Sequence, residues 1–293
     1  VKFGFSTPRG TLPASLRLPF HFGINSHVDA AGTQNRTWAV DVGLIPDTNV
    51  QLMDALARCK FEQLAALVHR DASLEALELI TNCFTAIFVF DDMIDDASSV
   101  IGGNKELATH VTRYLSAALA DEPRQRLRRD IPGYEQIISI GEALANVARR
   151  LMQFTDRAGI AEYVRGMRGY LMGCVAESEK RNTNVRSIAD YAAVRLCCSA
   201  MFPCFDAGAI VESYEVPEHI WTDRAFQTMR KDTNLCVSYV NDIFSYAKES
   251  SAGESSNIAL IFEQAMGLPL RDAMQRSMGT NDRVIEEYFE AKA

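Results

Sequence analysis

Apolar residues recur at three- and four-residue spacing through almost the whole chain. That spacing places them on one face of an α-helix, and no segment alternates apolar and polar residues as a β-strand would. The helical segments are 49–69, 73–93, 104–120, 131–155, 157–182, 187–202, 217–230, 231–250, 257–277 and 281–291. The sequence therefore predicts an all-α fold, a single large helical bundle of about ten helices.

No shift in composition or internal repeat divides the 293 residues, so we expect one domain over 1–293. Residues 1–47 are rich in Gly, Pro, Thr and Asn, which predicts an irregular arm with a short helix near 37–42. Residues 250–256 are rich in Ser, Gly and Glu and predict a loop.

Charge and cysteine content exclude several classes of protein. The chain has 30 basic and 38 acidic residues, a net charge of −8, so we expect no nucleic-acid partner. Apolar runs such as 64–68 and 86–90 are far shorter than the ~20 residues that span a bilayer, so we expect no membrane span. The seven cysteines include no CxxC pair, which predicts reduced thiols and a cytoplasmic location.

The first informative segment, FTAIFVFDDMIDD, runs from Phe84 to Asp96. On a helix, Phe84, Phe88, Asp91 and Asp95 share one face, so an aromatic stripe leads into two carboxylates. Four carboxylates within six residues repel one another and need compensation, and Mg²⁺ is the cation that such oxygen ligands suit. A solvated acidic helix end is the alternative interpretation.

The second segment, VSYVNDIFSYAKE, ends at Glu249. It places Asn241, Ser245 and Glu249 one helical turn apart, as a row of hard oxygen ligands for Mg²⁺. Lys248 lies almost on the same face and could reach a phosphate. The alternative interpretation is an ordinary polar helix face.

Together, these two motifs resemble the aspartate-rich motif and the second metal motif of class I terpene synthases of the microbial type. Their order and their separation of about 150 residues also match that family. In the family, a diphosphate-sensing arginine precedes the asparagine by about 46 residues, and Arg195 holds that position here. The resemblance covers essentially the whole chain.

The resemblance implies an enzyme that ionises and cyclises a linear prenyl diphosphate with the help of Mg²⁺, with three ions expected. Its metal ligands would be Asp91, Asp95, Asn241, Ser245 and Glu249. In the family, the departing diphosphate leaves a carbocation in a dry pocket. Loops near 96–104 and 250–256 would close over the metals.

Further residues follow from the same resemblance. Arg195 and Lys248 would bind the diphosphate. The carbonyl of Ser199, near an expected break in its helix, would face the substrate. Phe84 and Phe88 would line the pocket, although simple core packing explains them equally well.

Two departures from the family pattern stand out. Asp96 duplicates the acidic group of Asp95, so either could assist Asp91. The family's Arg-Tyr pair, expected roughly 80 residues after the second motif, would fall beyond Ala293, and we expect a C-terminal tail to be missing.

Two other functions stay open. A chain-elongating prenyltransferase of the same fold generally carries aspartates in place of Asn241, Ser245 and Glu249. A non-catalytic helical protein could bind prenyl diphosphate without turning it over. Farnesyl diphosphate is favoured over geranylgeranyl diphosphate because it is the commoner substrate among microbial relatives. Product and oligomeric state, monomer or homodimer, are left open.

Overall fold

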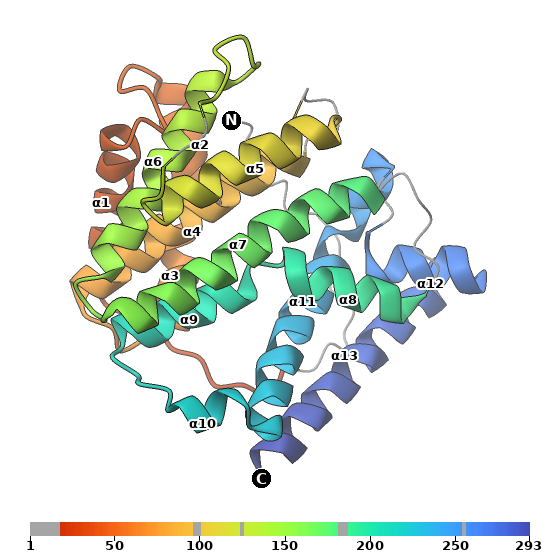
Figure 1. The fold of residues 1–293 in the computed structure, drawn as a ribbon. Helices are drawn as coiled ribbons and strands as arrows, with labels where there is room; N and C mark the ends of the chain where they lie inside the picture. Colours follow the sequence, from red (N-terminus) through yellow and green to blue (C-terminus); the bar gives the residue numbers. More distant parts are fainter. Residues whose placement is uncertain (1–17, 96–100, 124–125, 181–186, 254–255) are drawn as a thin grey trace. The chain divides into compact units, whose positions relative to one another are not determined.

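The computed structural model describes residues 18–95, 101–123, 126–180, 187–253 and 256–293. Every regular element in these residues is a helix (Figure 1), which confirms the all-α prediction. Contacts between Cα atoms divide the described chain into two compact units. Unit 1 holds His21–Val175 and Pro203–Glu215, and unit 2 holds 18–20, Ala176–Phe202 and Val216–Ala293. Each is described by itself, and the predicted single domain stays a prediction.

Unit 1 is built around one long apolar helix. Its helices are α1 (Val28–Asp41), α2 (Val50–Cys59), α3 (Phe61–Val68), α4 (Leu74–Asp95), α5 (Lys105–Leu119) and α6 (Tyr134–Leu151), with most of α7 (Arg157–Lys180) and of α9 (Met201–Val211). Helix α4 contacts α1, α3 and α6, and α5 packs on α6 (Figure 1). Helix α4 therefore has three other helices of unit 1 packed against it.

The position of α4 follows from its sequence. Buried apolar residues lie on several of its sides, and Leu77, Ile80 and Phe90 are fully buried, as expected of a helix surrounded by others. Buried polar side chains also fix its neighbours: Thr85 donates a hydrogen bond of 2.9 Å to Asn35 of α1. These contacts set the direction in which the aspartates at the end of α4 emerge.

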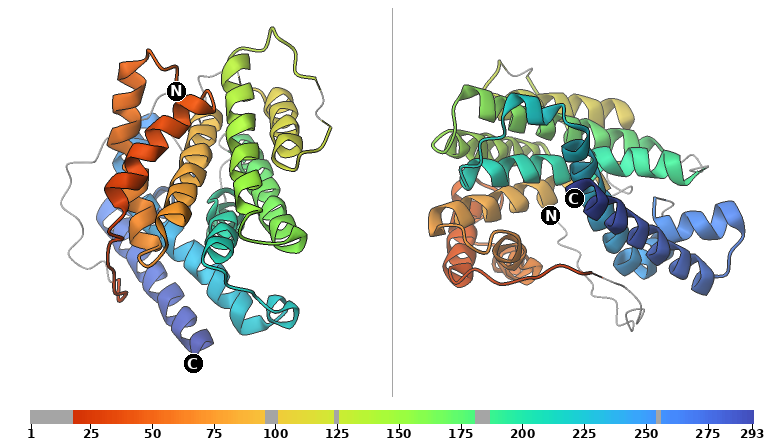
Figure 2. Two further views of the ribbon diagram at one scale, coloured as in Figure 1. Left: turned by 90° about the vertical axis from the view of Figure 1, so that its left-hand side faces the viewer. Right: turned by 90° about the horizontal axis from the view of Figure 1, so that it is seen from below.

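Unit 2 is a smaller bundle. Its helices are α8 (Ile188–Cys198), α10 (Glu218–Trp221), α11 (Arg224–Ala252), α12 (Ile258–Met266) and α13 (Leu270–Lys292). Helix α11 packs along α13 and also contacts α8 and α12 (Figure 2). The core cluster consists of Tyr191, Leu235, Cys236, Tyr239, Ile258, Ile261, Phe262, Ala273, Val284 and Ile285. Apolar faces of α8, α11, α12 and α13 therefore meet in one core.

The N-terminal part of the chain differs from its prediction. Helix α1 covers Val28–Asp41. Much of the expected arm is therefore helical, and the prediction of a short helix at 37–42 was wrong because the helix begins earlier. The segment 49–69 forms two helices, because Lys60 adopts the left-handed conformation (φ 58°) between them. A left-handed residue interrupts helical hydrogen bonding.

Three boundaries in the second half also differ. Residues expected as two helices, 217–230 and 231–250, form the short α10 and the continuous α11. Gly267 in the left-handed conformation ends α12, and Pro269 begins α13, which then runs unbroken to Lys292. Glycine commonly ends a helix and proline commonly stands at the start of one, and here they set the boundary although the apolar periodicity continues across it.

One stretch of the described residues, Ile188–Val211, is long and apolar enough to cross a membrane by length and composition. About 50% of it is buried inside the protein, and Ala200 (φ 59°) separates α8 from α9 within it. A buried core helix meets the same criterion, so the stretch is weak evidence for a membrane span.

A buried carboxylate links three helices of unit 2. Asp242 on α11 accepts hydrogen bonds from the Tyr191 hydroxyl and from the Arg195 guanidinium of α8, the latter 3.0 Å long. It also accepts the backbone N–H of Ile258, in the first turn of α12, at 2.7 Å. Because only 1% of the Asp242 side chain is exposed, these groups replace the water that a carboxylate loses on burial.

Replacing Asp242 with asparagine is expected to lower the free energy of unfolding by about 3 kcal/mol or more. An amide has one acceptor atom, so its NH₂ group must face either the Arg195 guanidinium or the Ile258 N–H. Urea unfolding followed by circular dichroism measures the change. The control is Asp223→Asn at the exposed N-cap of α11, where asparagine caps as well as aspartate. Equal stability of the two variants would contradict the expectation.

Candidate active site

In unit 1, the predicted aspartate face lies at the end of α4. Asp91 is half-buried in the last turn, and Phe84 and Phe88 precede it on the predicted face. Phe84 is buried, and the Phe88 ring stacks on Phe61 with centroids 4.9 Å apart. The structure thus shows a packing partner for the Phe88 ring, and the role of both rings as pocket wall stays a prediction.

A hydrogen bond from another helix reaches Asp91. The Tyr170 hydroxyl of α7 donates to Asp91 Oδ1 at 3.0 Å. Tyr170 is 2% exposed, and its ring lies edge-on to Phe90 at 5.7 Å. The position of one Asp91 oxygen is therefore set by a buried side chain.

In unit 2, the three predicted ligands of the second motif all lie on α11. This helix is continuous from Arg224 to Ala252, so Asn241, Ser245 and Glu249 follow one another at one-turn intervals, as predicted. Asn241 is exposed, whereas Ser245 and Glu249 are half-buried. Lys248 is exposed beside them.

The Glu249 carboxylate is held by Asn257. The Asn257 side-chain amide donates to Glu249 Oε2 at 2.8 Å and to the backbone carbonyl of Asp242 at 2.7 Å. Its oxygen accepts the backbone N–H of Ala259 at 2.9 Å and so caps α12. One fully buried side chain therefore joins the end of α11 to the start of α12.

Arg195 meets the second motif directly. Its Nη2 lies 3.0 Å from Asp242 Oδ1 and 3.3 Å from Asn241 Oδ1, and its Nη1 lies 4.0 Å from Glu177 Oε1. Its Nε is buried and has no hydrogen-bond partner among the described residues. The structure thus brings Arg195 and Asn241 together, as the 46-residue spacing implied.

The charges of Asp242 and Arg195 affect each other's pKa. Burial raises the pKa of the Asp242 carboxyl to about 7, while Arg195 and the hydrogen bond from Tyr191 oppose that rise. Burial lowers the pKa of Arg195, but the surrounding charges, that of Asp242 foremost, outweigh it and hold the pKa above its usual value. The guanidinium is therefore charged at any ordinary pH.

The helix break predicted after Arg195 is confirmed. Helix α8 ends at Cys198, Ser199 is its C-cap, and α9 begins at Met201. The Ser199 hydroxyl donates to Asn234 Oδ1 of α11 at 2.8 Å, so the break is anchored to the helix that carries the second motif.

Some predicted residues lie outside the described part of the chain. Asp95 is the last residue of α4, but its side chain is not described, and neither is Asp96. Most of the expected closing segment 96–104 and part of 250–256 are likewise outside it. The question of Asp95 against Asp96 therefore stays open.

The predicted ligands suit a hard cation by their chemistry. Within the described residues, no three His, Cys, Asp or Glu side chains cluster so as to hold a metal ion. The α11 ligands are instead an amide, a hydroxyl and one carboxylate, all oxygen donors of the kind that Mg²⁺ prefers. Asn241, Ser245 and Glu249 of unit 2 therefore fit a divalent cation by their chemistry, and Asp91 of unit 1 stays a predicted metal ligand.

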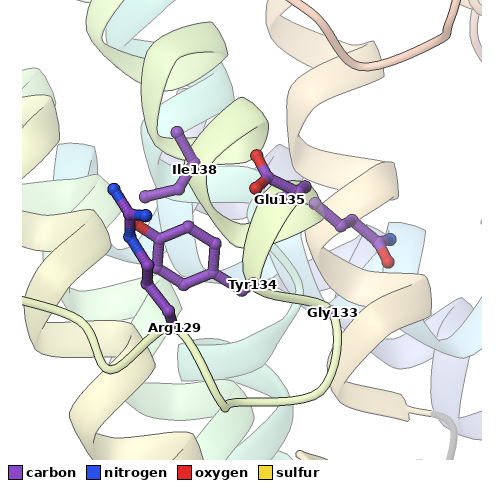
Figure 3. A pocket seen from close by; sticks show the side chains of 6 residues that line it. Arg129, Gly133, Tyr134, Glu135 and Ile138 are labelled. Carbon is purple, nitrogen blue, oxygen red and sulfur yellow. The ribbon is translucent and has the colours of Figure 1, made fainter.

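A pocket of about 630 Å³ lies elsewhere in unit 1, where α6 begins. Figure 3 shows Arg129 beside the Tyr134 ring, with Glu135 and Ile138 on the first turns of the helix. No predicted site residue lines this pocket, so the pocket is not evidence for the position of the active site.

Asp242, Asn257 and Tyr170 were not predicted from the sequence. A signal existed for two of them. Asp242 falls between apolar positions on the buried face of α11, where a carboxylate needs partners. Asn257 directly precedes the apolar run 258–262, which is the position of a helix N-cap. Tyr170 had no signal, because its partner is distant in sequence.

Comparison with known proteins identifies the family. The model of terpene synthase family 2, C-terminal metal binding, matches residues 82–286. The chain is 24% identical over 94% of its length to a (+)-T-muurolol synthase of Roseiflexus castenholzii, covering 80% of that protein. It is 28% identical over 89% of its length to the pristinol synthase of Streptomyces pristinaespiralis, covering 68%.

A solved structure shows the same fold. The germacradien-4-ol synthase of Streptomyces citricolor superposes with a TM-score of 0.77 at 21% identity, over 94% of this chain and 84% of that one. The family match includes the segments that carry Asp91, Arg195 and the α11 motif. The chain belongs to terpene synthase family 2 and is an enzyme, a class I terpene synthase with an all-α metal-binding domain.

Proposed function

We propose that the protein catalyses the Mg²⁺-dependent ionisation and cyclisation of farnesyl diphosphate to a cyclic C15 terpene, with release of diphosphate. The observation that carries the proposal is the arrangement on α11: three oxygen ligands one turn apart, with the charged Arg195 hydrogen-bonded to the first of them. The relative from Roseiflexus castenholzii is named as cyclising (2E,6E)-farnesyl diphosphate, which supports the chain length.

Bound Mg²⁺ would act as a Lewis acid that stabilises the charge on the departing diphosphate. The ligands in the protein would be Asn241, Ser245 and Glu249, together with Asp91. Glu249 already has one oxygen held by Asn257, so its carboxylate would need little reorientation to bind a cation.

Arg195 would bind the diphosphate as a planar fork of donors. Asp242 and Asn241 engage Nη2, whereas Nη1 lies 4.0 Å from Glu177 Oε1, so Nη1 is the part of that fork left for phosphate oxygens. Lys248, exposed on the same helix, would add a second positive charge. Both residues would stabilise the product diphosphate until the cyclisation ends.

The cation left after ionisation must be kept from water. Phe84 and Phe88 precede Asp91 on its helix face, and Phe88 is fixed by stacking on Phe61. Aromatic faces attract cations, so rings held rigidly near the diphosphate end of the substrate would favour the first carbocation. The support for Phe84 and Phe88 as pocket-wall residues is that they lie on the same face of α4 as Asp91.

The direct test is an incubation of the purified protein with farnesyl diphosphate, with Mg²⁺ or with EDTA, followed by GC–MS of the hexane extract. A cyclic C15 hydrocarbon or alcohol is expected with Mg²⁺ and none with EDTA. Geranylgeranyl diphosphate in a parallel reaction tests chain length. Longer prenyl diphosphates, formed only when isopentenyl diphosphate is added, would instead establish a prenyltransferase.

Glu249→Gln is expected to lower kcat/KM for farnesyl diphosphate by about 100-fold or more, because the only carboxylate of the α11 ligand row is lost. The matched control is Glu263→Gln on α12. Glu263 is also half-buried and accepts a hydrogen bond, from Tyr246, but belongs to no predicted ligand set. Steady-state kinetics with saturating Mg²⁺ measure both variants, and similar losses in the two would contradict the assignment.

A further inference from the structure

We propose that Tyr170 is a positioning residue for Asp91: its phenol fixes the carboxylate that binds the metal. This inference rests on the proposed function, because it takes Asp91 as a ligand. It concerns a residue outside both metal motifs, on a different helix from either of them.

The contact between the two side chains is well defined. Tyr170 Oη lies 3.0 Å from Asp91 Oδ1, while its distance to the backbone oxygen of Ile87 is 3.5 Å. The carboxylate is therefore the nearer of these two acceptors. The ring is 2% exposed and packs edge-on against Phe90, so its position is set by the core of unit 1.

Asp91 needs such a restraint because of where it lies. It is in the last turn of α4 and half-buried, and its neighbours Asp92 and Asp95 are also acidic. Repulsion between carboxylates favours rotamers that move them apart, whereas a shared cation needs them oriented together. A hydrogen bond to one oxygen limits rotation of the Asp91 carboxylate and opposes that spreading.

The Tyr170 hydroxyl suits the positioning of Asp91 because it is uncharged. An arginine or lysine in this place would neutralise Asp91 and compete with the metal. A phenol donates one hydrogen bond and stays neutral, so Tyr170 itself does not neutralise Asp91. Carboxylates that bind metals are commonly hydrogen-bonded in this way by a second layer of residues.

The chain offers a matched control on the same helix. Tyr163 lies two turns before Tyr170 on α7, is fully buried, and its hydroxyl contacts Cys83 Sγ of α4 at 3.4 Å. Cys83 in turn lies two turns before Asp91. Tyr163→Phe and Tyr170→Phe therefore remove the same atom between the same two helices, and only the second removes a hydrogen bond to Asp91.

The experiment measures metal binding without turnover. Thermal unfolding of each protein is followed in saturating inorganic pyrophosphate while the Mg²⁺ concentration is increased. Tyr170→Phe is expected to raise the Mg²⁺ concentration that gives half of the maximal stabilisation by about tenfold. Tyr163→Phe is expected to stay within about twofold of the wild type, although both variants lose a buried hydroxyl.

Kinetics with farnesyl diphosphate give an independent readout. Tyr170→Phe should need more Mg²⁺ for half-maximal rate and recover most of the wild-type kcat at high Mg²⁺, as expected when a ligand is misoriented rather than lost. A Mg²⁺ midpoint within twofold of the wild type, or an equal shift in Tyr163→Phe, would overturn the role of Tyr170. If the wild-type protein forms no terpene, but Tyr170→Phe alone shifts the Mg²⁺ midpoint, this inference is retained and the proposed function is rejected.

Discussion

The ion pair between Asp242 and Arg195 is the interaction on which unit 2 depends. A carboxylate with 1% of its side chain exposed is tolerable only if its hydrogen-bonding capacity is satisfied. The partners here come from α8 and from the first turn of α12. The desolvation of one side chain thus forces three helices into a fixed arrangement, in which Arg195 lies beside Asn241.

This arrangement also explains how Arg195 is held beside a motif that follows it by 46 residues in the sequence. Arg195 could not be held by α8 alone, since a lone guanidinium in an apolar environment is unstable. The buried carboxylate next to Asn241 both keeps it charged and directs it to the polar face of α11. The arginine of the structural ion pair is therefore also the residue proposed to bind diphosphate, so a change to the ion pair is expected to affect both roles.

The sequence predicted much of this from local patterns. Helical periodicity gave the fold class, and one-turn spacing on a helix placed Asn241, Ser245 and Glu249 in a row. The helix break at Ser199 and the proximity of Arg195 to Asn241 came from the resemblance to a family. The boundaries at Lys60 and Gly267 could not be predicted from apolar spacing, because a single left-handed residue leaves that spacing almost unchanged.

The residues that support the ligands were harder to predict, and the reason is physical. A candidate metal ligand is recognised from residue spacing within one helix. The residue that hydrogen-bonds to it can be recognised only when it is known which helices pack together. Asn257 acts on Glu249 over eight residues and Tyr170 acts on Asp91 over 79. Both are neutral donors, so neither adds a positive charge beside its carboxylate. The proposed ligands would thus keep their charge while uncharged neighbours hold them in position, and a search for acidic motifs does not find such neighbours.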